Sequence, residues 1–203
     1  MQNKQHKLVL ASASKARAAL LAGAGLEFTV NPADIDEDAI KDEFLSSPEQ
    51  PAQNLARILA EQKAKAISLI EPDAYIIGAD QILVYENEIL SKPASREKTK
   101  SQLEKLRGKT HFLTSAVSLA VNNEIIWTYS QSAQMSMRRF SDNFLEDYLQ
   151  TAGREIYGCV GGYQLEGTGA QLFSSVKGDY FTVLGLPLLA LLDVLRDEKV
   201  LIA

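Results

Sequence analysis

Apolar residues in the first part of the chain fall into short runs and longer periodic stretches. The short runs at residues 8–10, 28–31 and 74–79 are bounded by polar or small residues, which predicts strands. A helix is expected over about 15–24, because Ser14 can cap its start and Gly25 can end it. Strands and helices therefore alternate in this part of the chain.

A longer helical pattern follows Pro48 and Pro51. Its apolar positions recur at roughly helical spacing: Leu55, Ile58, Leu59, Ala66 and Ile70. The acids that precede it are expected to form a solvated loop: Asp34, Asp36, Glu37 and Asp38.

The middle of the chain is richer in strands. Residues 82–85 and 89–90 predict a hairpin that turns at Glu86-Asn87, and Ser95 can cap a helix that ends near Leu106. Residues 110–121, 124–129 and 134–138 then predict a meander of long strands, with a turn at Asn122-Asn123.

The last part of the chain returns to helices around a glycine-rich segment. Ser141 is expected to start a helix that ends near Gly153, and Pro187 to open a final helix as its first residue. Residues 170–176 and 180–183 predict a hairpin around Lys177-Gly178-Asp179. The order of elements favours an α/β fold with a mixed sheet rather than a plain dinucleotide-binding fold.

Composition bounds the class of protein. The 203 residues, 46% hydrophobic and 23% charged, suffice for one large domain or for two lobes that share a cleft. A net charge of −5 gives little support to nucleic-acid binding, although a local basic pocket can still hold a small polyphosphate. Cys159 is the single cysteine, which fits a reducing cytoplasm, and no apolar run is long enough for a membrane helix.

Candidate functional residues lie at the ends of two predicted strands. Asp80 follows the buried run at 74–79, where a carboxylate must be solvated, paired or bound to a metal. Ser12, Ser14 and Arg17 lie at a strand-to-helix turn that could hold a phosphate. The alternative is that Ser14 is only a helix cap and Arg17 a surface charge.

Other residues are less specific taken singly. Lys63 and Lys92 could be ordinary solvent-exposed charges. His6 and His111 do not form a plausible metal pair, and the chain has neither a Walker loop nor a dinucleotide-binding glycine motif. The glycines between Gly158 and Gly169 indicate either tight loops or a close approach of the backbone to another group.

Taken together, these segments resemble the Maf family of nucleoside-triphosphate pyrophosphatases from Leu8 to Leu195. The resemblance is carried by the order and spacing of Leu10-Ala11-Ser12-Ala13-Ser14-Lys15-Ala16-Arg17, Asp36-Glu37, Ala60-Glu61-Gln62-Lys63-Ala64, Gly78-Ala79-Asp80-Gln81, Ser91-Lys92-Pro93, Gly161-Gly162-Tyr163-Gln164-Leu165-Glu166-Gly167, Gly178-Asp179-Tyr180 and Gly185-Leu186-Pro187.

The resemblance implies a single Maf-like domain over residues 1–203, an elongated mixed α/β sheet in two lobes around a central cleft, like that of inosine-triphosphate pyrophosphatases. It also implies hydrolysis of a nucleoside triphosphate to the monophosphate and pyrophosphate, a divalent cation (Mg²⁺ or Mn²⁺) and a homodimer.

The resemblance further assigns roles to individual residues. Asp80 would be the proton acceptor, and Glu37 with Asp80 would hold the metal. The phosphates would be bound by Ser12, Ser14, Arg17, Lys63 and Lys92. Substrate choice would depend on Ala16, Gln81 and Glu166.

The pairs Asp80-Gln81 and Glu166-Gly167 resemble the subgroup that hydrolyses 7-methyl-GTP; members that prefer dTTP and UTP typically have Asp-Thr and Gln-Gly there. A carboxylate such as Glu166 can accept the N–H groups of a guanine edge and attract a base made cationic by 7-methylation.

The first motif departs from the family pattern. The family usually has two adjacent arginines, often after a proline, whereas here Lys15 stands in the proline position and Arg17 lies between Ala16 and Ala18. A lysine offers a point charge in place of a planar fork, so Lys15 would not be equivalent to the second arginine. This difference motivates an alternative function, a catalytically weak nucleotide-binding regulator of septum formation. A hydrolase for another phosphorylated metabolite is a third possibility.

Overall fold

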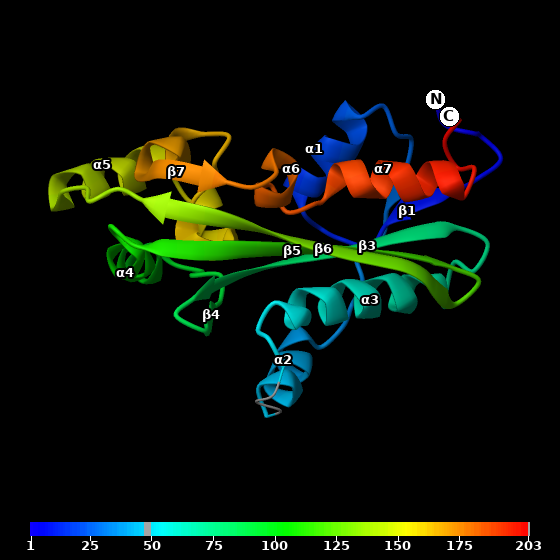
Figure 1. The fold of residues 1–203 in the computed structure, drawn as a ribbon, viewed down its shortest axis with the longest axis horizontal. Coiled ribbons are helices and arrows are strands. Elements are labelled where there is room, and N and C mark those ends of the chain that lie inside the picture. The colour runs from blue at the N-terminus through cyan, green and yellow to red at the C-terminus, as the bar shows by residue number, and fades with distance from the viewer. Residues whose placement is uncertain (47–49, 203) are drawn as a thin grey trace. The chain divides into compact units, whose positions relative to one another are not determined.

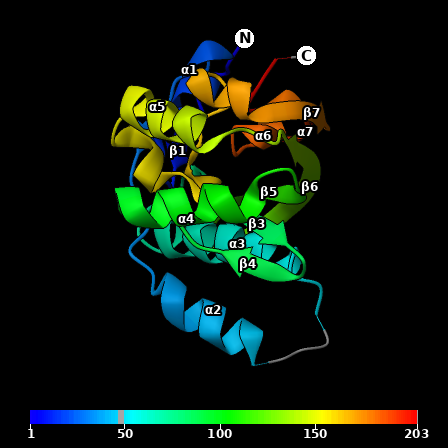
Figure 2. The ribbon, with the colours of Figure 1, turned by 90° about the vertical axis from the view of Figure 1, so that its left-hand side faces the viewer.

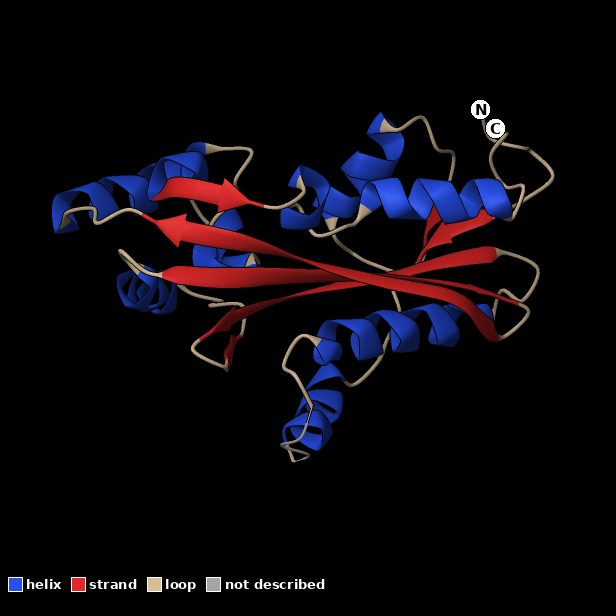
Figure 3. Cartoon of the chain, viewed as in Figure 1, coloured by secondary structure: helices blue, strands red, loops and turns tan. Residues whose placement is uncertain are grey.

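A seven-stranded mixed sheet forms the centre of the computed structural model, which describes residues 1–46 and 50–202 (Figures 1 and 3). The strand order is β2-β1-β3-β5-β6-β7, with β4 paired to β3. The strands are β1 (Leu8–Leu10), β2 (Thr29–Val30), β3 (Tyr75–Tyr85), β4 (Glu88–Leu90), β5 (Thr110–Val121), β6 (Glu124–Met137) and β7 (Phe173–Lys177). β1 is parallel to β2 and β3, whereas β4 is antiparallel to β3 and β7 to β6. The expected mixed α/β sheet is confirmed.

The helices are interspersed among these strands along the chain. They are α1 (Lys15–Gly23), α2 (Glu37–Leu45), α3 (Asn54–Ser68), α4 (Arg96–Leu106), α5 (Asp142–Ala152), α6 (Tyr180–Val183) and α7 (Leu188–Asp197). Short 3₁₀ turns lie at η1 (Glu155–Gly158), η2 (Val160–Gly162) and η3 (Thr168–Leu172). Within residues 1–46 and 50–202, none of the helices has both the length and the apolar character needed to cross a bilayer.

The chain divides into two compact units. The first unit comprises Met1–Gln81, Ser115–Gln131 and Gly185–Ala203, and the second comprises Ile82–Thr114 and Ser132–Leu184. The divisions fall within or beside the long strands β3, β5 and β6, so each of these strands contributes residues to both units.

The first unit is built on the parallel strands. α3 lies along one face of the sheet, and α1 and α7 lie on the opposite face (Figures 1 and 2). Small and branched side chains fill the space between sheet and helix, namely Val9, Ala11, Ala64, Ile67, Ala74, Ile76 and Ala120. The small residues among them allow the helix and the strands to approach closely.

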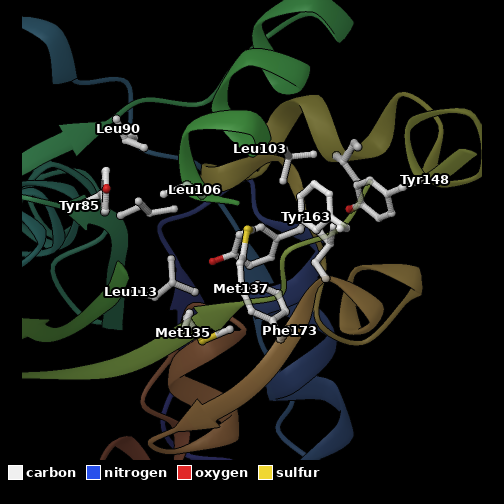
Figure 4. Packing of buried hydrophobic residues seen from close by; sticks show 14 of the residues in the cluster. Tyr85, Leu90, Leu103, Leu106, Leu113, Met135, Met137, Tyr148, Tyr163 and Phe173 are labelled. Atoms are coloured by element: carbon white, nitrogen blue, oxygen red, sulfur yellow. The ribbon is translucent and has the colours of Figure 1, made fainter. Parts of the chain in front are cut away.

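The second unit has a larger and more aromatic core. Leu103 and Leu106 of α4 enter this cluster from one side, and Met135 and Phe173 enter it from the strands on the other (Figure 4). α5 adds Leu145, Tyr148 and Leu149. This unit therefore has an apolar centre of its own.

Helix ends follow the chemistry expected from the sequence. The hydroxyl oxygens of Ser14, Ser95 and Ser141 each accept a hydrogen bond from a first-turn backbone N–H. Gly25 and Gly153 follow α1 and α5 with positive φ angles of 78° and 69°. The caps predicted for α1, α4 and α5 are confirmed.

Other local predictions were wrong. The acidic segment is not all loop, because Glu37 begins α2 and Asp36 caps it through the backbone N–H of Ala39. Acids in the first turn stabilise a helix start, and this signal outweighs the weak apolar pattern. Residues 180–183 form the helix α6, capped by Asp179, and not the second strand of a hairpin.

Element boundaries also differ. β3 and β6 are each continuous where breaks were expected near Ala79 and between 129 and 134. Pro187 occupies the N-cap position of α7 and not its first helical position. α3 begins at Asn54, and Pro48 lies outside the described residues.

Gly78 is the point of closest approach between β3 and α3. A Cβ atom placed there would lie 2.1 Å from the backbone oxygen of Ala60 and 2.6 Å from the nitrogen of Ala64. Backbone atoms of a helix cannot move aside as a flexible side chain can. Any side chain at position 78 therefore forces α3 away from the sheet.

We expect Gly78→Ala to lower the free energy of unfolding by about 3 kcal/mol or more, because the added methyl group displaces a packed helix. Chemical denaturation measures this change.

Gly23→Ala is the matched control, since a Cβ atom at Gly23 meets no atom within 4 Å. It lies in the last turn of α1, where alanine should add about 0.5–1 kcal/mol of stability. Equal stability of the two variants would contradict the close approach.

Candidate functional site

An ion-pair cluster in the first unit joins three sequence motifs. The ammonium of Lys63 on α3 lies 2.6 Å from Oδ1 of Asp80 on β3 and 2.8 Å from Oε1 of Glu37 at the start of α2. The Lys63 and Asp80 side chains are only 9% and 12% exposed, whereas Glu37 is half-exposed. Lys63 is therefore a buried charge held between two carboxylates, and not a solvent charge.

The register of β3 explains why Asp80 faces Lys63. Successive side chains of a strand point to opposite faces, so Gly78 and Asp80 point to the same one. Gly78 contacts α3 at Ala60 and Ala64, and Lys63 lies in that helical turn. The close approach at Gly78 thus brings the lysine within reach of the carboxylate.

Arg17 lies buried on α1 and joins three segments of the same unit. Its Nε donates to the carbonyl oxygen of Gly185 at 2.9 Å. Its Nη1 donates to the hydroxyl oxygen of Ser12 at 2.9 Å and to the carbonyl oxygen of Ala79 at 2.8 Å. The alternative interpretation of Arg17 as a surface charge is therefore wrong.

Burial and the neighbouring carboxylates act on the ionisation of Arg17 in opposite directions. Burial lowers the pKa of the Arg17 guanidinium, while the negative charges of Asp80 and Glu37 raise it. An arginine stays protonated in either case at neutral pH. Its Nη2 makes no hydrogen bond to any residue in 1–46 or 50–202, and this atom can therefore donate to an anion.

The remaining residues of the first motif have different surroundings. Ser14 caps α1, as its hydroxyl accepts from the Arg17 backbone N–H at 3.4 Å. Ala16 is half-buried, and Lys15 is exposed. The predicted helix cap at Ser14 is thus confirmed, while its role in phosphate binding stays a prediction, and Ser12 is buried against Arg17.

Gln81 follows Asp80 on the strand and points away from α3. Its Nε2 donates to the hydroxyl of Ser115 on β5 at 3.0 Å. A Cβ atom at Gly185 would lie 3.8 Å from its Oε1 and 3.5 Å from Nε of Arg17. Gln81 therefore lies beside the Arg17 anchor, and Asp80 lies beside Lys63.

Two further candidates lie in the second unit. Lys92 and Glu166 are exposed, and the charges of both act on the pKa of the Cys159 thiol, which is raised mainly by burial. Lys92 also lines a groove of about 420 Å³ between β4 and α4, which contains none of the first-unit candidates. The structure thus places these two residues near one thiol within their own unit.

The ligand set suits a hard divalent cation bound together with substrate. Among the described residues no group of three or more His, Cys, Asp or Glu side chains converges on a point. Glu37 and Asp80 supply two carboxylates, and Mg²⁺ commonly uses one or two carboxylates plus substrate phosphates. Two carboxylates balance the charges of Lys63 and Arg17, so a bound triphosphate would call for added positive charge.

Sequence reasoning missed several partners of these residues. The carbonyl oxygens of Ala79 and Gly185 hold Arg17, and the hydroxyl of Ser115 holds Gln81. A backbone carbonyl carries no residue-specific signal, and Ser115 lies in a long buried strand that looks like ordinary core.

Comparison with known proteins identifies the class. Residues 7–198 match the family model described as Maf-like protein, which covers most of the chain. The chain belongs to this family.

Relatives at 43–49% identity carry two kinds of name. A nucleoside triphosphate pyrophosphatase of Paramagnetospirillum magneticum is 49% identical over 194 residues, covering 96% of this chain and all of that protein. A 7-methyl-GTP pyrophosphatase of Brucella abortus is 47% identical over 193 residues, covering 95% and 96% of the two chains. Another 7-methyl-GTP pyrophosphatase, from Rhizobium meliloti, is 43% identical over 190 residues, covering 94% and 95%.

A solved structure of a nucleoside-triphosphatase (dITP/XTP pyrophosphatase) from Mycobacterium abscessus aligns with a TM-score of 0.45 at 18% identity. It covers 95% of this chain and 97% of its own. A likeness at this level does not bear on the function.

We expect Arg17→Lys to lower the free energy of unfolding by about 3 kcal/mol, because the single nitrogen atom of an ammonium cannot reach the oxygen atoms that Nε and Nη1 of Arg17 bind from different positions. Thermal or chemical unfolding measures the change.

Arg57→Lys on α3 is the control, since the Arg57 side chain is 50% exposed and pairs with Glu61 on the same helix. It should change stability by less than about 0.5 kcal/mol. A small effect at both positions would show that Arg17 is not a structural anchor.

Proposed function

We propose that the protein is a metal-dependent nucleoside-triphosphate pyrophosphatase, a hydrolase of acid anhydrides that favours a guanine nucleotide such as 7-methyl-GTP. The observation that carries the proposal is the buried cluster in which Lys63 joins Asp80 and Glu37 beside the Arg17 anchor. Family membership and the names of its relatives support the same reaction.

Asp80 is the proposed proton acceptor. Lys63 contacts its Oδ1, and no described residue donates a hydrogen bond to Oδ2, which leaves that oxygen for a water molecule. The water oxygen attacks the α-phosphorus, its proton passes to Asp80, and the bond from the α-phosphorus to the bridging oxygen breaks, so that pyrophosphate leaves.

Charge stabilisation accounts for the other residues. Lys63 and Nη2 of Arg17 offer positive charge to the triphosphate in a largely buried setting, where such interactions are strong. Glu37 and Asp80 would hold a divalent cation, which neutralises phosphate charge and polarises phosphoryl oxygens when bound. Lys92 is proposed as a further phosphate ligand.

Base selection is assigned to Gln81, to Glu166 and to Ala16 of the first motif. The exposed carboxylate of Glu166 can accept guanine N–H groups and can attract a 7-methylated, cationic base. The divalent metal, the homodimer and a cytoplasmic location stay predictions that rest on the family resemblance.

Asp80→Asn should reduce pyrophosphate release by about 10²–10⁴-fold or more, since asparagine cannot take the proton. The assay is pyrophosphate release by purified protein with Mg²⁺ or Mn²⁺, with circular dichroism to confirm the fold. Asp73→Asn, at an exposed position before β3, is the control and should leave the rate unchanged. A near-normal rate for Asp80→Asn would refute the mechanism.

A panel of 7-methyl-GTP, GTP, UTP, dTTP and CTP tests the substrate. We expect 7-methyl-GTP to have the highest kcat/KM, and Glu166→Gln to lower that value about tenfold, with a smaller loss for GTP. Preference for UTP or dTTP would favour the other family activity.

Tight nucleotide binding without pyrophosphate release would favour the regulator. Turnover of a phosphorylated metabolite that lacks a nucleobase, at the same rate as the nucleotides, would favour a hydrolase for another phosphorylated metabolite.

A further inference from the structure

His111 and Tyr163 are two polar side chains inside the core of the second unit. His111 on β5 is 0% exposed, and Tyr163, directly after η2, is 5% exposed. Their neighbours are apolar or aromatic, and the rings of both pack against Phe173, at 6.0 Å and 4.8 Å between centroids. Polar groups in such surroundings are retained at a cost unless they bond to each other.

The two side chains do bond to each other. Nε2 of His111 lies 2.6 Å from the hydroxyl oxygen of Tyr163, while Nδ1 has no hydrogen-bond partner among the described residues. Burial lowers the pKa of His111 to about 4 and raises that of Tyr163 well above its usual value, so both are neutral at pH 7. The neutral Nε2 of His111 can accept a hydrogen bond from the Tyr163 hydroxyl, which leaves Nδ1 as the one polar atom of the pair without a partner among the described residues.

Tyr163 lies in the segment that carries Glu166. The two residues before it, Gly161 and Gly162, have φ angles of 81° and 71°, a conformation that strongly favours glycine. The hydroxyl of Tyr148 donates to the carbonyl oxygen of Gly162 at 3.1 Å. The start of the segment is therefore fixed by two buried tyrosine hydroxyls.

A tight turn follows at once. The Gly167 N–H donates to the carbonyl oxygen of Gln164 at 3.3 Å, so Leu165 and Glu166 occupy the middle of the turn. A Cβ atom at Gly169 would lie 2.3 Å from the same Gln164 oxygen, which shows how closely the returning chain packs. The position of the exposed Glu166 thus depends on where Tyr163 enters the core.

We infer that His111 is a positioning residue for base selection: its hydrogen bond to Tyr163 holds the segment 161–167 in the one arrangement that presents Glu166 to the nucleobase. The inference rests on the proposed function, because it takes Glu166 as the residue that meets the base.

The hydrogen bond between His111 and Tyr163 restrains the tyrosine in a way that apolar packing alone would not. A phenylalanine at position 163 would fill nearly the same volume, but it could slide or tilt against Phe173 without losing a directional contact. The imidazole-hydroxyl pair fixes how deeply the ring enters the core, because the hydroxyl oxygen must stay within hydrogen-bond distance of Nε2 of His111. A glycine-rich segment has little stiffness of its own, so this anchor decides its conformation.

The test compares Tyr163→Phe and His111→Leu with the unmodified protein by amide hydrogen exchange over residues 161–167. Loss of the hydrogen bond should speed exchange in this segment about tenfold, with the amides of β5 and β6 unchanged. Tyr85→Phe is the matched control, because Tyr85 belongs to the same core cluster but its hydroxyl binds Glu86.

The second readout is the preference for a methylated base, measured by calorimetry with 7-methyl-GMP and GMP. These ligands need no turnover, so failure of the proposed hydrolysis would not be mistaken for failure of this inference. Tyr163→Phe and His111→Leu should each reduce the ratio of the two Kd values about tenfold. His111→Gln, whose amide can reach the position of Nε2, should restore the ratio to within about threefold of the unmodified protein.

Two results would overturn the inference. One is that Tyr163→Phe speeds amide exchange in residues 161–167 but leaves the ratio of the Kd values for 7-methyl-GMP and GMP unchanged. The His111–Tyr163 pair would then be only a contact within the core. The other is an equal rise of exchange throughout the second unit, which would mean that the variants lower global stability and not the order of this segment.

Discussion

The close contact between β3 and α3 at Gly78 is the constraint on which the candidate site depends. A Cβ atom at this position would overlap the helix backbone, so the separation of helix and strand is set by the absence of a side chain. That separation decides whether Lys63 reaches Asp80. Lys63 lies in the helical turn that contacts Gly78, and Asp80 lies two residues after Gly78 on the strand. Packing and chemistry are thus coupled through one glycine.

Burial gives the two cations of the site different roles. Arg17 uses Nε and Nη1 to hold three separate segments, whereas Lys63 is shared between two carboxylates. A guanidinium spreads five donors over three nitrogen atoms in one plane, whereas an ammonium has three donors on a single nitrogen atom and reaches only oxygen atoms close to that point. This difference explains why the single arginine of the first motif serves as a structural anchor and why exposed Lys15 is no substitute for a second one.

Local signals in the sequence predicted much of the fold. Serine caps and glycine ends located α1, α4 and α5, and apolar runs located β1 and β5, because these features act over a few residues. The errors lie where local signals compete. Asp36 and Glu37 read as a solvated run but cap and begin α2, and Tyr180 read as a strand residue although Asp179 caps a short helix there.

For the site, the sequence by itself determined which residue types were present and in what order, and this order was enough to establish the family. It singled out Asp80 as a carboxylate on a buried strand, since an acid beside apolar residues must find a partner. The identity of that partner was decided only by the tertiary structure. Lys63, Ser115 and the carbonyl oxygens of Ala79 and Gly185 are brought to the site by packing between elements far apart in the chain. Burial and pairing are properties of the whole fold, and no local pattern of residues specifies them.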